Sequence, residues 1–507
     1  TLFRSDDSLK DTELAYWKKL DGSLTLSVGT AKLYDYPIRD IILDLNKDAK
    51  DFVVKKASAV FPGNTKVKLN GNFGTQFEVF EGNLTFDTQD FRSYANWASF
   101  NKVDYLPQNR FRTINFNSNI AFRPGAATFV GIEGKFDNTN FTGEMRFRWG
   151  KENNISSTLM FDSINFDIYK NYPLDDEKNS PQLDITLKDK NKSFNFHEVF
   201  GNETDFNLNV FIRNAIFYGK KINGLKFLGS ISKDLIKIEN ISVDNLQGLS
   251  LLAKGEVKMS NPTPNFDIEL QINSDSKNLA NFLGFSEKTK HILSGKFISN
   301  FRLDGEISDF KTEINAEIAD LNISYSGNVN LINFKVSKLE GAISLEHQNV
   351  GKFFAEKFGV KEDVYAGVGK FNTRIYYSDK DTLELKDIVF MSDNIEYKGN
   401  SKTTYDNNGL NFQSNINGNY MDMSDLLSFL KYFNITNFLY EKNGVKNNLL
   451  GNLKIQLDNF SVYDMELKSV KLYSKFNSEN VEINSFDGEI YNGLFSINSS
   501  ITRTENI

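Results

Sequence analysis

The residues that could bind a metal ion occur in one suggestive run, Asp44-Leu45-Asn46-Lys47-Asp48. Oxygen-bearing side chains at alternate positions begin the calcium-binding loop of an EF-hand. That loop needs glycine at its sixth position and glutamate at its twelfth, whereas this sequence has Ala49 and Lys55 there. We therefore interpret the run as a hairpin turn, and we predict no metal site.

Residues for other kinds of catalysis are present but not grouped. The chain has no cysteine, and its three histidines, His197, His291 and His347, are far apart. No serine, aspartate or glutamate forms a recognisable nucleophile setting with them. Gly367-Val368-Gly369 lacks the third glycine of a dinucleotide site. The sequence predicts neither an enzyme nor a cofactor, although a glycosidase with two distant carboxylates stays open.

Composition narrows the class of protein further. The 59 basic and 66 acidic residues nearly balance, which disfavours nucleic acid as a partner. The 45 Phe, 20 Tyr and 8 Pro suit β-strands and argue against disorder. Because no run of about 18 apolar residues occurs, no membrane-spanning helix is predicted. The chain starts at Thr1 and stops in mid-pattern at Ile507, so we expect a piece of a longer protein.

Apolar and polar residues alternate strictly along most of the chain. This period of two predicts strands with one apolar and one polar face. One expected strand, for example, carries Val130, Ile132 and Phe136 on a shared face. The strands are expected to be short, often under 9–11 residues. Turns are predicted at five pairs that end in glycine, namely Asn70-Gly71, Asn223-Gly224, Asp304-Gly305, Asn408-Gly409 and Asp487-Gly488.

The pattern that begins at Leu24 returns near the end of the chain. An offset of 429 residues carries Leu24-Thr25-Leu26-Ser27-Val28 onto Leu453-Lys454-Ile455-Gln456-Leu457. The match continues without a gap to Pro62-Gly63-Asn64. A looser third copy lies between them, starting at Phe206, Leu208 and Val210. Repetition of this kind predicts an architecture that extends by adding units.

Four short helices are expected between the strands, and the repeats divide the chain. We expect a leading helix at 1–20 and a linker at 173–181. The first repeat unit spans 21–180, with a helix near 90–100, and the second spans 181–290, with a helix near 275–285. Intermediate β-segments span 291–440, with helices near 351–358 and 424–433, and a truncated third unit spans 441–507.

The fold class predicted is mainly β: an elongated, curved, antiparallel β-sheet groove built from repeats, with a few short helices. Two sheets pressed together by their apolar faces are the simpler alternative. Few helices exist to cover so many one-faced strands, which favours a groove that shields an apolar ligand. The residues expected to line it are Leu24, Leu26, Val28, Ile114, Phe116, Phe141, Met145, Phe147, Leu249, Leu251, Phe266, Ile268, Leu270, Phe297 and Phe301.

Several segments resemble the AsmA family, which is related to the TamB and YhdP groups. These are Leu20-Asp21-Gly22-Ser23-Leu24-Thr25-Leu26, Leu33-Tyr34, Pro62-Gly63-Asn64, Leu69-Asn70-Gly71, Phe80-Glu81-Gly82-Asn83-Leu84 and a closing strand at 485–493. The sequence departs from the family at Asn64, where a second glycine is usual. The resemblance implies a periplasmic lipid transport protein of Gram-negative cell envelopes, anchored in the inner membrane by an N-terminal helix absent from this chain.

The same resemblance implies phospholipids as partners, a role in outer-membrane biogenesis and homeostasis, and contacts with outer-membrane or envelope proteins. Two structural alternatives without transport remain. A transmembrane β-barrel also alternates, but it would have regular strands without intervening helices. A β-solenoid that binds protein or glycan along its length would have shorter and more regular repeats.

Overall fold

A computed structural model describes residues 21–502 with gaps. The longer gaps are 99–109, 170–203, 283–294 and 433–448, and the shorter ones are 34–35, 49–50, 75–77, 152, 260–262, 307, 319, 333–334, 379–381, 407–408, 464 and 478–479. The leading helix expected at 1–20 and the linker expected at 173–181 lie outside the described residues. The chain forms two compact units, Thr1–Met259 and Ser260–Ile507, which are described separately.

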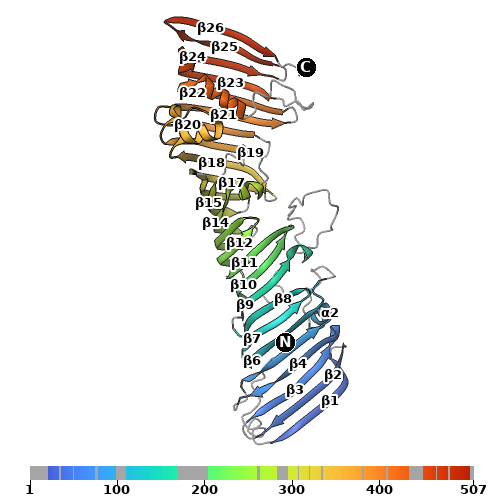
Figure 1. The fold of residues 1–507 in the computed structure, drawn as a ribbon. Helices are drawn as coiled ribbons and strands as arrows, with labels where there is room; N and C mark the ends of the chain where they lie inside the picture. The colour runs from blue at the N-terminus through green and yellow to red at the C-terminus, as the bar shows by residue number, and fades with distance from the viewer. Residues whose placement is uncertain are drawn as a thin grey trace. The chain divides into compact units, whose positions relative to one another are not determined.

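The described part of the first unit consists mainly of thirteen strands, which can be followed in Figure 1. They are β1 (Gly22–Leu33), β2 (Tyr36–Lys47), β3 (Phe52–Phe61), β4 (Thr65–Phe73), β5 (Phe80–Thr88), β6 (Ile114–Arg123), β7 (Ala126–Phe136), β8 (Thr139–Arg148), β9 (Asn153–Asn165), β10 (Thr204–Phe217), β11 (Lys220–Ile231), β12 (Leu235–Leu246) and β13 (Leu249–Lys258). Its helical segments are η1 (Pro62–Asn64), α2 (Phe91–Trp97) and η3 (Phe166–Tyr169).

The described part of the second unit also has thirteen strands. Its strands are β14 (Asn265–Asp275), β15 (Lys296–Glu306), β16 (Asp309–Ile318), β17 (Leu321–Ile332), β18 (Lys335–His347), β19 (Gly369–Ser378), β20 (Thr382–Met391), β21 (Glu396–Asp406), β22 (Gly409–Asp422), β23 (Leu449–Val462), β24 (Met465–Phe476), β25 (Asn480–Ile490) and β26 (Gly493–Thr502). Its helices are α4 (Ser276–Phe282), α6 (Val350–Phe358), η4 (Glu362–Tyr365) and α7 (Met423–Tyr432). The predicted mainly β class is confirmed, and α2, α4, α6 and α7 lie where short helices were expected.

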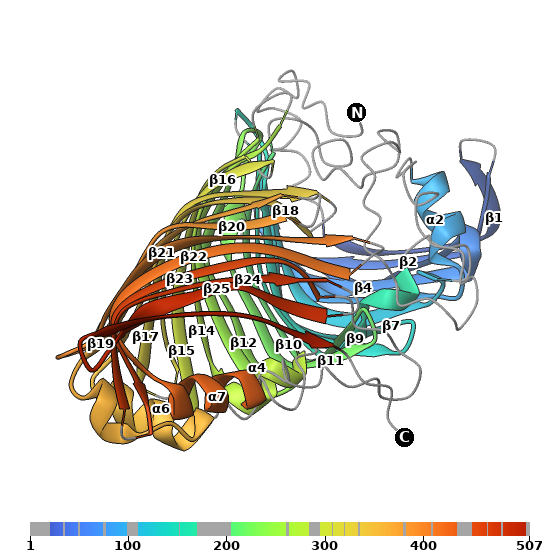
Figure 2. The ribbon, with the colours of Figure 1, turned by 90° about the horizontal axis from the view of Figure 1, so that it is seen from above.

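Within each unit, each strand described pairs with its neighbours in the chain, and nearly all pairs are antiparallel. Figure 2 shows that the strands of each unit bow along their length. The expectation of a wholly antiparallel sheet is wrong at two places, because β9 pairs with β10, and β22 with β23, in parallel. Both β10 and β23 begin a copy of the sequence repeat. A parallel pair needs a crossover connection, which local alternation does not reveal.

The sequence repeat is also a repeat of strand register. In the first and third copies, the second and third strands pair with two register shifts, where β-bulges interrupt the ladder. An offset of 429 carries one set of shifts onto the other. In the first copy one shift lies between Arg39 and Ile42 and the other between Asp44 and Leu45. In the third copy they lie between Lys468 and Lys471 and between Tyr473 and Ser474.

Left-handed backbone recurs at one position of this repeat. Asp40 has φ 53°, and Ser469, which lies 429 residues later, has φ 52°. In the middle copy the same position is Gly224, with φ 64°. Only glycine adopts such angles without strain. The three copies therefore share this left-handed position as well as an apolar pattern. They also share one register shift, at Asp44/Leu45, Leu228/Gly229 and Tyr473/Ser474, whereas the shift beside the left-handed residue is found in the first and third copies and not at Gly224.

The strands are longer than predicted, from 9 residues in β4 to 14 in β10, β22 and β23. Several glycine pairs taken for turns lie inside strands instead: Asn70-Gly71 in β4, Asn223-Gly224 in β11, Asp304-Gly305 in β15 and Asp487-Gly488 in β25. Gly409 does begin β22, while Asn408 is not described.

The reason that a glycine sits inside β4 is steric. Gly71 lies directly opposite Gly82 on β5. A Cβ atom on Gly71 would approach the carbonyl oxygen of Glu81 to 2.2 Å and the Phe80 ring to 2.8 Å. The ring of Phe80 therefore covers the glycine pair, and the glycines mark close packing rather than a change of chain direction.

Candidate functional site

The described residues hold neither a cluster of three or more potential metal-ligating His, Asp or Glu side chains nor a helix with the length and hydrophobicity of a membrane span. What stands out instead is one face of each sheet. Directly paired residues on adjacent strands point to the same face. The strand register therefore traces which side chains share a face across many strands.

In the first unit, one cross-strand row can be followed from β1 to β8. It runs through Leu24, Leu45, Val54, Gly71, Gly82, Ile120, Phe129 and Met145. The row then continues through Ser157 and Leu208 to β11 and β12. Every member is apolar or small, although the strands come from separate hairpins. One face of the first unit is thus continuously apolar, and we call it the apolar face.

Aromatic rings form a ladder along this apolar face. Consecutive centroid distances are 5.3 Å for Phe52–Phe73, 5.0 Å for Phe73–Phe80, 6.4 Å for Phe80–Phe122, 6.1 Å for Phe122–Phe129 and 5.7 Å for Phe129–Phe147. Such distances are typical of favourable aromatic pairs. The ladder spans six strands from β3 to β8. It gives the apolar face a continuous hydrocarbon surface.

A second group of rings lies further along the same strands. Phe86 stacks on Phe116 at 5.3 Å, and Phe141 contacts Phe161 at 6.0 Å. Phe86 also meets Tyr94 of α2 at 5.2 Å. Ala95 of the same helix is fully buried. This short helix therefore packs over one end of the strands.

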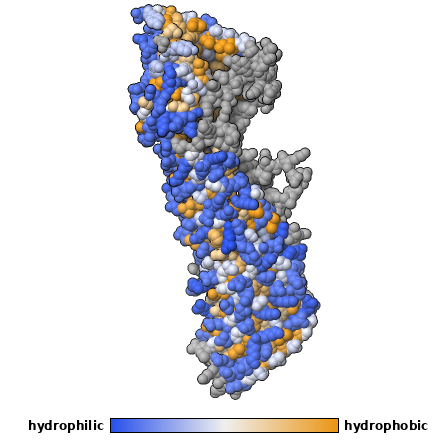
Figure 3. All heavy atoms as spheres, in the orientation of Figure 1, coloured by the Kyte–Doolittle hydropathy of each residue, from blue (hydrophilic) through white to orange (hydrophobic). Residues whose placement is uncertain are grey.

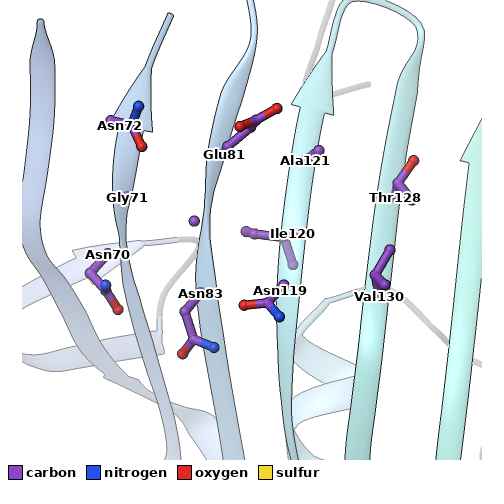
Figure 4. Close-up of a pocket in the computed structure, with 11 residues that line it drawn as sticks. Asn70, Gly71, Asn72, Glu81, Asn83, Asn119, Ile120, Ala121, Thr128 and Val130 are labelled. Carbon is purple, nitrogen blue, oxygen red and sulfur yellow. The ribbon is translucent and has the colours of Figure 1, made fainter.

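The opposite face of the first unit is polar. Asn70, Asn83 and Asn119 lie side by side on β4, β5 and β6 (Figure 4). They line a shallow hollow of about 510 Å³ together with Asn72, Glu81 and Thr128. The visible surface of this unit is mainly hydrophilic in Figure 3. Polar groups on this face can stay hydrated while the other face holds apolar groups.

The second unit has an apolar face built in the same way. One row runs through Leu270, Phe301, Ile314, Tyr325 and Ile343 on five strands. Its neighbours Ile268 and Leu303 pair beside it, as do Phe297 and Ile318. Further along, Ile455, Leu457, Phe460, Leu467 and Val470 form a buried cluster on β23 and β24.

The structure places the predicted lining residues on these two faces. Those on the apolar face of the first unit are Leu24, Leu26, Val28, Ile114, Phe116, Phe141, Met145, Phe147, Leu249 and Leu251. Those on the apolar face of the second unit are Phe266, Ile268, Leu270, Phe297 and Phe301. Contact of these side chains with a lipid stays a prediction.

Val130, which was expected to share a strand face with Ile132 and Phe136, lies on the opposite face of the sheet. Val130 pairs with Asn119 on the polar face and is 48% exposed, whereas Ile132 and Phe136 lie on the apolar face. Gly131 between them has φ 62° and interrupts the alternation. The extra residue of a β-bulge moves the side chains that follow it to the opposite face of the strand. The isolated glycine within the strand pattern is the sequence feature that could have indicated this bulge.

Sequence reasoning also missed important parts of the apolar face. Phe80, Ile120 and Phe206 are among its most buried residues, with Ile120 only 3% exposed. Phe80 was overlooked as a lining residue because the glycines that it covers resemble turns. Phe129 escaped notice because the bulge at Gly131 separates it from Ile132.

A charged cluster lies apart from the apolar face, where η4 meets α7. The Nζ of Lys361 is 3.2 Å from Oδ2 of Asp422. The backbone N–H of Lys361 donates to Oδ1 of Asp425 at 3.1 Å. Asp425 is 1% exposed, and its Oδ2 has no hydrogen-bond partner among the described residues.

The two carboxyl groups of this cluster differ in acidity. Burial raises the pKa of Asp425 above its ordinary value. Burial also acts on Asp422, but hydrogen bonds from Ser424 and the Lys361 ammonium outweigh it and hold the pKa of Asp422 below its ordinary value. Such a pair can hold the helices against the sheet.

No known protein family matches the chain, and no curated protein shows significant similarity to it. The features that remain for a functional argument are therefore its own: an apolar face in each unit and, in the first unit, a polar face opposite it.

Proposed function

We propose that this chain carries lipids by shielding acyl chains on its apolar faces while the lipid head groups stay in water. The observation that carries the proposal is the row from Leu24 to Met145, which stays apolar across eight strands. A structural sheet protein needs apolar residues only where it packs. A lipid carrier needs them without interruption along the path.

The energetic reason is the cost of exposing hydrocarbon to water. At about 0.8 kcal/mol per methylene, a sixteen-carbon chain exposes on the order of 10 kcal/mol. A surface with Leu24 at 54% exposure already presents apolar area that a bound chain would cover. Contact with the aromatic ladder would recover most of that cost.

The cellular setting proposed follows the resemblance to the AsmA family. The protein would act in the periplasm of a Gram-negative envelope, attached to the inner membrane by a helix outside this chain. It would carry phospholipids between the inner and outer membranes and support outer-membrane biogenesis and homeostasis. It would do so without enzymatic chemistry, as a bridge-like conduit, with envelope proteins as further partners.

Extraction of lipid from the purified protein tests the proposal. The chain is expressed in a Gram-negative host, purified without detergent and extracted with organic solvent, and phospholipid is measured by mass spectrometry. A stoichiometric amount of phospholipid is expected. Transfer of a fluorescent phospholipid between vesicles should also rise with protein concentration. Recovery of no lipid together with no transfer would favour a purely structural β-protein.

A further inference from the structure

The strand β1 has a free edge where two later strands of the same kind have a neighbour (Figure 1). Among the described strands, β1 pairs with β2 alone. The repeat carries Leu24 of β1 onto Leu208 of β10, an offset of 184 residues, and onto Leu453 of β23, an offset of 429. Both β10 and β23 pair with the strand that follows, as β1 does, and also with the strand that precedes them. We call the side of β1 without such a neighbour the β1 edge.

The three equivalent strands have the same pairing on their occupied side. Each pairs antiparallel with the next strand, and each ladder omits one residue. That residue is at the same position of the repeat in every copy, namely Gly29, Arg213 and Asp458. The strand β1 is therefore built like β10 and β23, and their other side shows what its free edge can accept.

The two preceding strands, β9 and β22, join β10 and β23 in parallel and in one register. Both parallel ladders also omit Arg213 or Asp458, the repeat position that the antiparallel ladders omit. At the repeat positions of Leu24 and Leu26, the pairs are Leu208–Ser157 and Val210–Leu159 in one junction, and Leu453–Ser414 and Ile455–Ile416 in the other. Two junctions far apart in the sequence thus share one geometry.

The preceding strands also share a residue pattern. Serine is followed two positions later by a branched aliphatic residue, and an apolar residue closes the pattern five positions after that, as in Ser157-Thr158-Leu159-Met160-Phe161-Asp162-Ser163-Ile164 and Ser414-Asn415-Ile416-Asn417-Gly418-Asn419-Tyr420-Met421. Asp162 accepts the backbone N–H of Asn140 at 3.0 Å, and Asn419 accepts that of Glu396 at 2.9 Å. Both contacts tie the pattern to the strand before it. The pattern therefore defines the kind of strand that joins this side of a repeat.

The apolar residues of the repeat are buried only where this neighbour is present. Leu26 of β1 is 45% exposed, whereas its equivalent Ile455 in β23 is 6% exposed. Val28 is half-buried, whereas its equivalents Ile212 and Leu457 are each 5% exposed. The strand β1 thus keeps residues suited to burial without a described strand that buries them.

We propose that the β1 edge binds one β-strand of another polypeptide, parallel to β1 and bearing the pattern shared by β9 and β22. The edge of a sheet offers backbone N–H and C=O groups to an added strand, and the alternate side chains select its sequence. The serine of the added strand lies opposite Leu24, and its branched aliphatic residue lies opposite Leu26. The added strand extends the apolar face of the first unit, but its binding does not depend on lipid.

A second copy of this chain fits the β1 edge less well. The repeat carries β4 onto β26, and β4 pairs antiparallel with β5. The outer edge of β26 therefore suits an antiparallel partner, whereas the β1 edge suits a parallel one. A head-to-tail contact between β26 of one copy and β1 of another cannot satisfy both edges.

Paired cysteines test the direction and register of the added strand. The chain has no cysteine, so each introduced thiol is unique. The probe is a synthetic peptide with the sequence of residues 409–422, which form β22. The register of β22 on β23 places Asn415 of the peptide opposite Thr25 and Tyr420 opposite Thr30. Neighbouring strands are about 4.8 Å apart, which is within the range that a disulfide bridges.

Matched and crossed thiol pairs are compared in a glutathione buffer by mass spectrometry. Thr25→Cys in the full chain should form a disulfide with the Asn415→Cys peptide, and Thr30→Cys with the Tyr420→Cys peptide. Each crossed combination separates the thiols by about 16 Å along the strands. Because no disulfide spans that distance, crossed pairs should give only the background yield of a peptide with scrambled sequence.

Binding of the labelled peptide by fluorescence anisotropy tests the side-chain contact. Leu26→Ser should weaken binding about tenfold, because it removes apolar area that the aliphatic residue of the peptide covers. Leu494→Ser is the matched control, since Leu494 is 87% exposed on β26, and it should bind the peptide as wild type does. Circular dichroism checks that both variants keep the β-sheet.

The outcomes distinguish the occupants of the edge. Crossed disulfides in excess of matched ones, no binding of the peptide, or equal binding by wild type and Leu26→Ser would each overturn the inference. Disulfide-linked dimers of Thr25→Cys that the peptide does not suppress would assign the β1 edge to a second copy and overturn it too. Co-purification of phospholipid is a separate measurement, so failure of the proposed function and failure of this inference are distinguishable.

Discussion

Leu24 and Met145 occupy one cross-strand row on one face of the first unit, although they belong to β1 and β8. Seven successive pairings connect them, and each keeps the apolar or small side chain on the same side. Bulges at several of these pairings shift the register. The apolar row persists because the sequence changes its alternation at the same points.

A charge on the apolar face should block transfer without unfolding the sheet. Phe147→Asp in the first unit and Leu270→Asp in the second each place a carboxylate among apolar side chains, which disfavours passage of an acyl chain. We expect vesicle-to-vesicle lipid transfer to fall at least tenfold. Arg148→Asp on the polar face is the control and should transfer normally. Transfer at the wild-type rate by both well-folded variants would contradict the conduit.

Truncation at the centre of the apolar face should destabilise the first unit. Ile120 is 3% exposed and packs with Val54 and Phe80. Ile120→Ala should lower the free energy of unfolding by about 2–5 kcal/mol, the range for such core truncations. Val130→Ala on the polar face is the control, with an expected loss under about 1 kcal/mol. Urea denaturation measures both, and similar losses would argue against a packed apolar face.

Glycine should stabilise the bulge of the third repeat. Ser469 has φ 52°, a conformation that costs a non-glycine residue about 1–2 kcal/mol. Ser469→Gly removes that strain but adds about 0.4–1 kcal/mol of unfolded-state entropy. The net gain should be about 0.5–1 kcal/mol by urea denaturation, while Ser469→Val should lose stability. A loss on substitution by glycine would show that the Ser469 side chain outweighs its backbone strain.

The stability of the α7 region should depend on pH in two opposite ways. Because the pKa of Asp425 is raised, its contribution is present at low pH and is lost as pH rises from about 3.8 through the folded-state pKa. Because the pKa of Asp422 is lowered, its contribution is present at neutral pH and is lost as pH falls below about 3.8.

Two isosteric variants separate these contributions. Asp425→Asn should raise the hydrogen-exchange protection of α7 at neutral pH, because it removes a buried carboxylate oxygen that has no partner. Asp422→Asn should lower protection at neutral pH, because it removes the ion pair with Lys361, but not near pH 3. If the two variants respond alike to pH, this assignment of the two carboxyl groups is wrong.

The sequence carries most of the local information in this fold. The offset that links Leu24 with Leu453 predicts a repeat, and the structure shows the same bulges in both copies. The four short helices also follow from local signals. Periodicity and turn chemistry act over a few residues, and these features depend on nothing more distant.

The remaining features depend on contacts that the local pattern does not contain. The parallel pairing of β9 with β10 follows from the path of a crossover connection. The place of Gly71 inside a strand depends on Gly82 and Phe80 of the next strand. The β1 edge stands out only when its equivalents β10 and β23 are seen to pair in parallel with the strand before them.

Within each unit, the pairing of every described strand with its neighbour in the chain has a consequence for how the protein folds. Each strand needs only the preceding strand as a template, so the mean sequence separation of contacts stays small for so large a β-protein. Such a chain can fold progressively as it is synthesised, one hairpin after another. The growing end then presents an unpaired strand edge, which the next strand covers before it can aggregate.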